Sequence, residues 1–287
     1  MPDTGRLLVC ATPIGNLGDV TLRVLGALGE VDTVLAEDTR VTRKLFSRYS
    51  IATALERYDG HIAAKRTPEV VERMLAGERF ALVSDAGTPG ISDPGSMLVD
   101  AALEAGVPVE VLPGASAILM ALVASGLPTR SFFFGGFLPR KAGERGRLLE
   151  SLAALEATLI FYESPRRTAA TLHALSEAFP GRTGAMAREL TKLHEEVLRG
   201  PLPDLAEQIA QRENVKGEVV LLVGPPAGRK TAASYPAPVD EELVRARVAR
   251  LIDEGATRTA AVKQVAREMG VERNTVYDLT MGRKGDA

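Results

Sequence analysis

Several features are scarce in this sequence of 287 residues. It has one cysteine, Cys10, so an internal disulfide is excluded and a reducing compartment is favoured. The apolar neighbours of Cys10 indicate a buried structural thiol. The chain has no apolar run of about 18 residues, the length that spans a bilayer. Met1 and the residues after it lack the basic and apolar regions of a secretory signal. We therefore expect a cytoplasmic protein without a membrane partner.

Common cofactor motifs are missing as well. The sequence contains neither the glycine fingerprint of dinucleotide-binding folds nor a Gly-Lys-Ser/Thr phosphate loop, which disfavours a Rossmann dehydrogenase. The three histidines, His61, His173 and His194, lie far apart and lack the spacing of metal ligands, so we expect no metal.

Charge gives only a weak indication of a partner. The net charge is −2, with no overall basic excess. Residues 229–287 carry 11 Lys and Arg against 9 Asp and Glu, a net charge of +2, which leaves −4 for residues 1–228. The tail is therefore the part better suited to face a polyanion.

Short apolar runs alternate with helical patterns, as is typical of parallel sheets covered by helices. Strands are predicted at residues 6–11, 33–36, 80–83, 108–112, 132–135, 158–162, 183–187, 195–199 and 218–223. Helices are predicted at residues 21–28, 67–76, 96–105, 115–125, 144–155, 164–179 and 204–212, with Thr67 as a cap before Pro68. Because the pattern restarts after Gly126, we expect two α/β domains, residues 1–126 and 127–226.

Two polar loops follow predicted strands, at the sheet edge where open α/β sheets bind ligands. In the first, residues 12–19, Gly15 and Gly18 allow a ligand to approach the backbone, although a plain turn explains the loop equally well. The second, Glu-Asp-Thr-Arg at 37–40, suits a polar site, or equally a helix start capped by Asp38.

The longest loop is Ser-Asp-Ala-Gly-Thr-Pro-Gly-Ile-Ser-Asp-Pro-Gly at 84–95. Its length is unusual for a strand-to-helix connection, and such loops commonly carry function. A turn at 113–117, Pro-Gly-Ala-Ser-Ala, adds small side chains at a helix start, where an adenosine could lie close to the backbone. We expect these loops to form a binding site.

Taken together, these motifs resemble the ribosomal RNA small subunit methyltransferase I family. The resemblance rests on the loops at 12–19, 37–40 and 84–95 and on four further motifs. These are Gly-Phe-Leu-Pro-Arg-Lys at 136–141, Phe-Tyr-Glu-Ser-Pro-Arg-Arg at 161–167, Ala-Arg-Glu-Leu-Thr-Lys at 187–192 and Lys-Gly-Glu at 216–218. It covers about residues 6–224. It implies the tetrapyrrole methylase fold, a non-Rossmann class III methyltransferase fold in which S-adenosylmethionine lies between two α/β domains. The implied activity is 2′-O-methylation of a cytidine in the decoding region of 16S small-subunit ribosomal RNA.

The resemblance also implies roles for single residues and a homodimer. The residues implied for the cofactor are Asp85, Gly87, Thr88, Ile91, Ser116, Ala117, Tyr162, Leu190 and Gly217. Those implied for the acceptor, either ribosomal RNA or the assembled 30S subunit, are Pro13, Gly15, Asn16, Arg140, Lys141 and Arg188.

The chemistry calls for a base, because a ribose hydroxyl is a poor nucleophile. Asp38, Glu163 and Glu189 are candidate bases by membership of these motifs. Arg40 and Lys192, like Arg188, could orient the phosphate or the ribose. A structural ion pair explains each of these side chains equally well.

A proline-rich linker, residues 227–239, precedes an appendage at 240–287 with helices predicted at 241–254, 259–269 and 273–279. The last two have a helix-turn-helix layout. The apolar face expected there is Ala260, Val262, Val265, Ala266 and Met269, with Val271 and Val276 beside it. Arg273 and Asn274, with Thr275 and Tyr277, suit nucleic-acid contact. A plain helical cap is the alternative.

Two other functions remain open. A precorrin-type methylase of the same fold would act on a small acidic macrocycle, which the Glu-Asp-Thr-Arg run and the tail disfavour. A ligand-sensing helix-turn-helix regulator would use the α/β domains as sensor and the tail to read duplex DNA.

Overall fold

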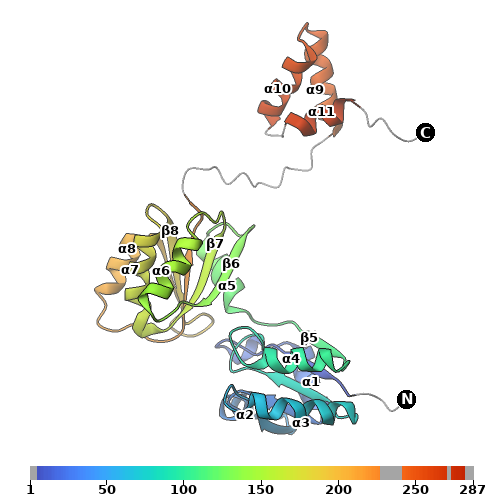
Figure 1. Ribbon diagram of the computed structural model, residues 1–287, viewed down its shortest axis with the longest axis vertical. Coiled ribbons are helices and arrows are strands. Elements are labelled where there is room, and N and C mark those ends of the chain that lie inside the picture. Colours follow the sequence, from blue (N-terminus) through green and yellow to red (C-terminus); the bar gives the residue numbers. More distant parts are fainter. Residues whose placement is uncertain (1–4, 227–240, 270–272, 282–287) are drawn as a thin grey trace, which may run out of the picture. The chain divides into compact units, whose positions relative to one another are not determined.

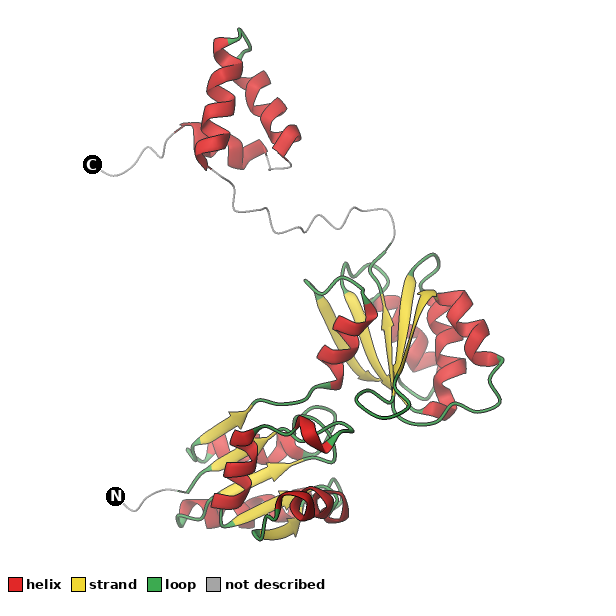
Figure 2. Ribbon diagram, turned by 180° about the vertical axis from the view of Figure 1, so that it is seen from behind, coloured by secondary structure: helices red, strands yellow, loops and turns green. Residues whose placement is uncertain are grey.

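The computed structural model describes residues 5–226, 241–269 and 273–281 (Figure 1). The chain divides into two compact units, Met1–Ala227 and Gly228–Ala287. The first unit contains two five-stranded sheets covered by helices, and the second contains helices alone among its described residues (Figure 2). No described helix is both long and apolar enough to cross a membrane.

The first sheet is entirely parallel, in the order β3-β2-β4-β1-β5. Its strands are β1 (Leu7–Cys10), β2 (Thr33–Ala36), β3 (Ala54–Arg57), β4 (Phe80–Val83) and β5 (Val109–Leu112). The three central strands are buried along their whole length, which explains their continuous apolar sequences.

Four helices cover the two faces of this sheet: α1 (Leu22–Glu30), α2 (Thr39–Tyr49), α3 (Ala63–Leu75) and α4 (Gly95–Glu104). A short 3-10 helix, η1 (Leu17–Asp19), precedes α1. Because strand side chains alternate, Leu7 packs with α3 and α4, whereas Leu8 packs with α1 and α2. Cys10 is also in the second of these layers, where burial raises the pKa of its thiol to about 12, so it is a structural residue as predicted.

The second sheet is mixed, in the order β6-β7-β10-β8-β9. Its strands are β6 (Phe132–Phe137), β7 (Thr158–Glu163), β8 (Thr183–Arg188), β9 (Glu196–Pro201) and β10 (Val219–Val223). The expectation of parallel sheets is wrong here, since β10 runs antiparallel to both β7 and β8. The short connection from β8 to β9 makes those strands an antiparallel pair, and β10 enters beside β8.

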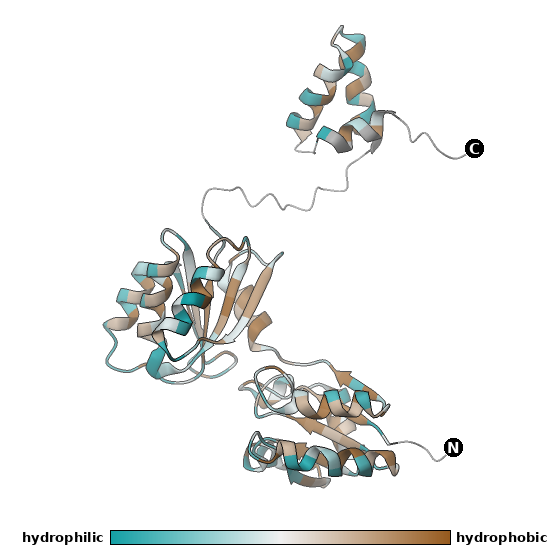
Figure 3. Ribbon diagram, in the orientation of Figure 1, coloured by the Kyte–Doolittle hydropathy of each residue, from teal (hydrophilic) through white to brown (hydrophobic). Residues whose placement is uncertain are grey.

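Helices cover both faces of the second sheet. One face packs against α6 (Ala142–Ser151), α7 (Thr168–Ala178) and α8 (Leu202–Ala210), with the 3-10 helix η2 (Pro165–Arg167) leading into α7. The other face packs against α5 (Ala117–Ser125), whose Ala121 and Leu122 contact residues of β7, β8 and β10. Figure 3 shows α5 hydrophobic along its length, in keeping with this burial.

The structure differs from the predicted elements around α2, β3 and α3. No element was predicted at β3, whereas α2 begins at the helix start capped by Asp38 that was one of the two readings of residues 37–40. The predicted cap at Thr67 is wrong because α3 begins at Ala63. The Thr67 hydroxyl instead donates to the Ala63 carbonyl oxygen over 2.8 Å, and Pro68 lies inside the helix. The turn before α3 is held by Asp59, whose carboxylate accepts from the backbone amide of His61 over 2.9 Å.

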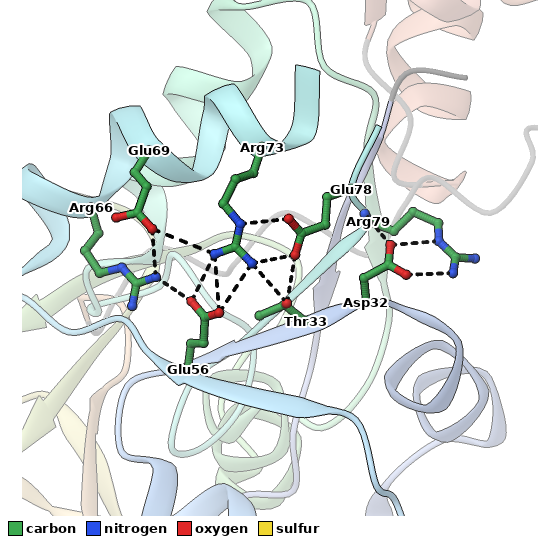
Figure 4. A network of polar contacts seen from close by, with 8 residues as sticks. All are labelled: Asp32, Thr33, Glu56, Arg66, Glu69, Arg73, Glu78 and Arg79. Carbon is green, nitrogen blue, oxygen red and sulfur yellow. Dashed lines mark hydrogen bonds and ion pairs between the residues drawn. The ribbon is translucent and has the colours of Figure 1, made fainter. Parts of the chain in front are cut away.

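A polar network joins α3 to the first sheet (Figure 4). Glu56 of β3 pairs with both Arg66 and Arg73 of α3. Arg73 Nε donates to Glu78 Oε2 over 2.7 Å, and its guanidinium lies 4.7 Å from the centre of the Phe80 ring. Burial opposes ionisation of Glu56, but hydrogen bonds from both arginines keep its pKa below the ordinary value. The network therefore anchors α3 over the edge strand.

The second unit is a three-helix cluster of α9 (Glu241–Asp253), α10 (Arg258–Met269) and α11 (Arg273–Met281). Its buried residues are Val244, Val248, Ala261, Val262, Val265 and Val276. The predicted place of Ala260 in the apolar face is wrong, since Ala260 is exposed and its neighbour Ala261 is buried. Val271 lies outside the described residues.

Candidate functional site

A cavity of about 500 Å³ opens among the loops of the first unit. The loops after β1, β2, β4 and β5, with the first residues of α5 (Ala117–Ser125), contribute Ile14, Glu37, Ser84, Asp85, Ala86, Gly87, Thr88, Ile91, Ser92, Asp93, Ser116, Ala117 and Ile118. The second sheet and its connections contribute Phe137, Tyr162, Glu163, Ser164, Pro165, Gly217, Glu218, Val219 and Val220. Parallel strands end at the same edge of the first sheet, which explains why these distant loops meet.

The long loop after β4 is held in shape by its own carboxylates and glycines. Asp93 Oδ1 accepts from the amides of Gly90 and Gly95, over 2.8 and 2.7 Å. Gly87, with φ 79°, adopts a left-handed conformation that favours glycine. Its amide donates to the Thr12 carbonyl oxygen over 3.0 Å and its carbonyl oxygen accepts from the Thr12 amide over 2.9 Å, so the first and third loops form one surface.

The loop after β2 is tied to the same surface. Asp85 Oδ1 accepts from the Asp38 backbone amide over 3.0 Å. The Asp38 carboxylate is occupied by Arg40, whose Nε donates to Asp38 Oδ1 over 3.0 Å, and this pairing lowers the pKa of Asp38 to about 2. Neither Asp38 nor Arg40 lines the cavity. Their predicted catalytic roles therefore have a structural alternative, the start of α2, which Asp38 caps.

The opposite wall is built around Gly217. Its φ is 87°, a left-handed conformation that favours glycine, and a Cβ there would lie 2.3 Å from Glu189 Cδ, so a larger residue would strain the backbone and displace the Glu189 side chain. Glu189 Oε1 accepts from the Glu218 amide over 3.0 Å, and Lys192 Nζ donates to Glu189 Oε1 over 2.8 Å. The hydrogen bond from Lys192 is the main reason that the pKa of Glu189 is lowered. Glu189 and Lys192 thus brace the wall without lining the cavity.

The first loop packs against the turn that follows β8. The Asn16 amide donates to Thr191 Oγ1 over 3.0 Å, and a Cβ on Gly15 would lie 2.5 Å from Lys192 Cγ. This close approach explains the glycine at position 15. Pro13 is buried, and the Asn16 side chain accepts from the Gly18 amide over 2.9 Å, so a structural role is open to both residues.

Glu163 lines the cavity yet is only 3% exposed. Its Oε2 accepts from Thr171 Oγ1 over 2.6 Å and lies 3.3 Å from Arg167 NH2, while its Oε1 accepts from the Ser164 amide over 2.7 Å. These contacts join the end of β7 to η2 and α7. The carboxylate is therefore fully engaged within the protein.

The residues predicted for the cofactor come together in the structure. Eight of them line the cavity: Asp85, Gly87, Thr88, Ile91, Ser116, Ala117, Tyr162 and Gly217. Leu190 does not line the cavity; it is buried in the apolar cluster that contains Ile14. Their contact with a cofactor remains a prediction.

The residues predicted for RNA are more dispersed. Arg140 and Lys141 are exposed, and Lys141 Nζ lies 3.1 Å from Glu144 Oε1. Arg188 is half-buried and pairs with Glu196 over 3.1 Å. Arg273 is exposed on α11, while the Asn274 side chain lies outside the described part of the structure.

Several cavity residues were not predicted as site residues, among them Glu37, Phe137 and Glu218. Phe137 ends β6, and its ring centre is 5.5 Å from that of Tyr162. Each lies in a motif quoted above, so motif membership could have indicated them. Within the described residues no cluster of histidine, cysteine or acidic side chains has the geometry of a metal site.

Comparison with protein families and solved structures identifies the class of protein to which this fold and cavity belong. The family model for Tetrapyrrole (Corrin/Porphyrin) Methylases matches residues 6–206. The crystal structure of the methyltransferase CobJ superposes with a TM-score of 0.60 at 26% identity, covering 79% of this chain and 96% of that one. A uroporphyrin-III C-methyltransferase from Thermus thermophilus, complexed with S-adenosyl homocysteine, shares the fold with a TM-score of 0.54 at 21% identity, covering 77% of this chain and 97% of that one.

Curated relatives are more similar. A ribosomal RNA small subunit methyltransferase I from Mesorhizobium japonicum is 48% identical over 83% of this chain and 80% of its own length. Its namesake from Synechocystis is 44% identical over 98% of this chain and 99% of its own length. The chain therefore belongs to the tetrapyrrole methylase family and, within it, to the ribosomal RNA small subunit methyltransferase I family. It is an enzyme that uses S-adenosylmethionine.

The cavity fits this cofactor in size and chemistry. A volume of about 500 Å³ is within the usual range for small-molecule sites. Gly87 and the small side chains at 86, 116 and 117 leave room for a nucleoside against the backbone. Ile14, Ile118 and Val220 give it apolar walls, and the carboxyl groups of Glu37 and Asp85 suit a cationic ligand.

Proposed function

We propose that this enzyme methylates the 2′-hydroxyl of a cytidine in the decoding region of 16S small-subunit ribosomal RNA, in the cytoplasm. The observation that carries the proposal is the cavity itself, in which loops of the first sheet and of the second sheet line one cofactor-sized space. The names of relatives that are 44–48% identical supply the class of acceptor.

The cofactor supplies an electrophilic methyl group, so the chain is left with binding, alignment and the handling of one proton. Ser116, Ala117 and Tyr162 would position the nucleoside part, and Asp85, Gly87, Thr88 and Ile91 the remainder. Apolar side chains such as Ile14 and Ile118 would exclude water from the reacting atoms.

The acceptor would be ribosomal RNA or the assembled 30S subunit. Arg140 and Lys141, at the end of β6, and Arg273 on α11 are exposed cations that could contact phosphate. Arg188, Gly15 and Asn16 would act near the cavity mouth. This division gives the α/β domains, residues 1–126 and 127–226, the chemistry, and gives the appendage, residues 240–287, a role in gripping RNA.

We further propose a homodimer, as the fold family implies. The outer side of α5 supports a self-association surface, because Leu119 and Val123 are 53% and 73% exposed although apolar. Sedimentation of the purified protein should give twice the mass of the chain, and Val123→Lys should reduce it to one chain.

The function is tested by supplying purified enzyme with S-adenosylmethionine carrying a labelled methyl group. Naked 16S RNA, 30S subunits and a precorrin-type macrocycle should be offered in parallel. Label in ribosomal RNA, mapped by mass spectrometry to a ribose of a cytidine, is the expected result. Label in the macrocycle alone, or tight binding to a specific DNA duplex without transfer, would replace the proposal with one of the other two functions.

A further inference from the structure

Glu37 occupies a distinctive place in the cavity. It follows Ala36, the last residue of β2, which is in register with Val83 of the neighbouring β4. Glu37 therefore lies beside the start of the long loop, and it lines the cavity half-buried. The backbone amide of Asp85 acts on the Glu37 carboxyl group in the direction that lowers its pKa. Among the described side chains, none donates a hydrogen bond to it or forms an ion pair with it.

The other cavity carboxylates are occupied. Glu163 is held by Thr171 and Arg167, and Glu218 Oε2 accepts from Lys192 Nζ over 3.0 Å. Asp93 Oδ1 accepts from two amides of its own loop, and Asp85 Oδ1 accepts from the Asp38 amide. In the described chain, Glu37 and Asp85 are thus the two cavity carboxylates that accept no hydrogen bond from a side chain and no more than one from a backbone amide. Asp85 is among the residues predicted for the cofactor, which leaves Glu37 for the acceptor.

The surroundings of Glu37 also make it a better proton acceptor than an ordinary carboxylate. Burial raises its pKa most, followed by the negative charges of Asp85, Asp93 and Asp59, while the Asp85 amide acts in the opposite direction. These groups come from the loops after β4 and β3, the two elements that flank the end of β2. The cation nearest in sequence, Arg40, is engaged by Asp38.

We propose that Glu37 is the catalytic base of the methyl transfer, the residue that receives the proton of the acceptor hydroxyl. As the hydroxyl oxygen bonds to the methyl carbon and displaces sulfur, the electron pair of the broken carbon–sulfur bond stays on sulfur. The hydroxyl proton passes to Glu37, which then releases it to solvent. The inference rests on the proposed function, because it requires a hydroxyl acceptor.

Two substitutions test this role. Glu37→Gln keeps the shape of the side chain but cannot accept the proton, and its kcat should fall by about 10²- to 10⁴-fold, the usual contribution of general base catalysis. Glu37→Asp keeps the carboxyl group and should retain more activity than Glu37→Gln. Glu104→Gln, an exposed position on α4, is the matched control and should behave as wild type.

The pH profile and a titration without cofactor separate catalysis from structure. The kcat of the wild type should rise with pH as Glu37 loses its proton, and Glu37→Gln should lose this rise. In the enzyme alone, carbon-13 NMR of glutamate carboxyls should show one group that titrates above the ordinary range and is absent in Glu37→Gln. Because the Glu37 carboxylate also adds negative charge to the cavity, Glu37→Gln should bind S-adenosylmethionine somewhat more weakly by calorimetry, and this loss should be much smaller than the fall in kcat at saturating cofactor.

Three outcomes overturn the inference: an unchanged kcat in Glu37→Gln, a loss confined to cofactor affinity, or a wild-type pH profile in the variant. Circular dichroism checks that both variants are folded, and Glu37→Asp still tests the inference if Glu37→Gln does not fold. Failure of the proposed function would give a different result. The wild type would then transfer no methyl group to ribosomal RNA, whereas the raised titration of the Glu37 carboxyl group would still be observed.

Discussion

Gly217 illustrates how a single backbone conformation shapes the cavity. With φ 87° and Glu189 Cδ 2.3 Å from the position of a Cβ, Gly217→Ala must strain the backbone and displace the Glu189 side chain. We expect it to lower the free energy of unfolding by at least about 1–2 kcal/mol, the cost of a left-handed conformation for a residue with a side chain. Affinity for S-adenosylmethionine should fall as well. Urea unfolding and calorimetry measure the two effects.

Gly143 offers a matched control, since it lies in the first turn of α6 and a Cβ there meets no atom within 4 Å. Gly143→Ala should leave cofactor affinity unchanged and raise the free energy of unfolding by about 0.5–1 kcal/mol, as alanine favours helix. Equal effects of the two substitutions would mean that the conformation at Gly217 is not what maintains the wall.

Glu196 should contribute to stability in a pH-dependent way. Hydrogen bonds from Arg212, and then from Arg188, lower its pKa from 4.5 to about 2. A carboxyl whose pKa is lowered on folding stabilises the protein above its unfolded pKa, and this contribution disappears as the pH falls through the window from about 4.5 to about 2. Glu196→Gln should therefore destabilise the protein at about pH 6 and have a smaller effect at about pH 3, where part of this contribution has been lost.

Urea unfolding of wild type and Glu196→Gln at both pH values provides the measurement. Glu104→Gln, whose carboxyl group is exposed on α4, should show no such change between the two. A destabilisation of the same size at both pH values would show that Glu196 acts by packing and not by its charge.

For single residues, the sequence predicted which of them lie at the cavity better than it predicted which side chains pair with one another. The motifs correctly predicted that Asp85, Thr88 and Tyr162 lie at the cavity. This was possible because a residue that follows a strand must lie at that edge of the sheet. Motif membership alone could not distinguish Asp38 from Glu37. That distinction depends on where Arg40 places its guanidinium, and a side-chain pairing leaves no pattern in the residue types.

At the scale of elements, α5 shows why a boundary is hard to predict. The sequence expects it to close the first domain, because Gly126 ends it, and Gly126 does adopt the left-handed C-cap with φ 70°. Yet Ala121 and Leu122 pack against the second sheet. An almost wholly apolar helix has no polar face to reveal which sheet it covers. The start of α3 was mispredicted for a similar reason. It depends on the turn held by Asp59, and the spacing of apolar residues does not indicate such a turn.

The packing of α5 leads to a further prediction. Leu122 is 2% exposed among residues of β7, β8 and β10, so Leu122→Ala should leave a cavity and cost about 2–5 kcal/mol of unfolding free energy. Leu103→Ala, at a leucine 58% exposed on α4, is the same change without burial and should cost little. The denaturant midpoints of Leu122→Ala and Leu103→Ala measure the two costs. Equal midpoints would contradict the packing of Leu122 against the second sheet.

At the scale of the whole molecule, the cavity and the helical appendage lie in different units. Every residue that lines the cavity lies in the first unit, Met1–Ala227, and the second unit has its own apolar core around Val262 and Val265. The sequence predicted this appendage from its helical periodicity and the proline-rich stretch before it. It could not predict that Ala261 rather than Ala260 is buried, because alanine fits either face of a helix.

A chain truncated after Ala227 should therefore keep the cofactor affinity of the full chain and lose affinity for ribosomal RNA. If the appendage neutralises phosphates, the slope of log affinity against log salt should become shallower by about 0.7–0.9 for each phosphate that the truncated chain leaves unpaired. Arg273→Ala in the full chain should reproduce part of that change, because Arg273 is an exposed cation at the start of α11. Fluorescence anisotropy with labelled RNA over a salt series measures the slope. An unchanged slope after truncation would mean that the α/β domains alone bind the RNA and that the appendage serves another purpose.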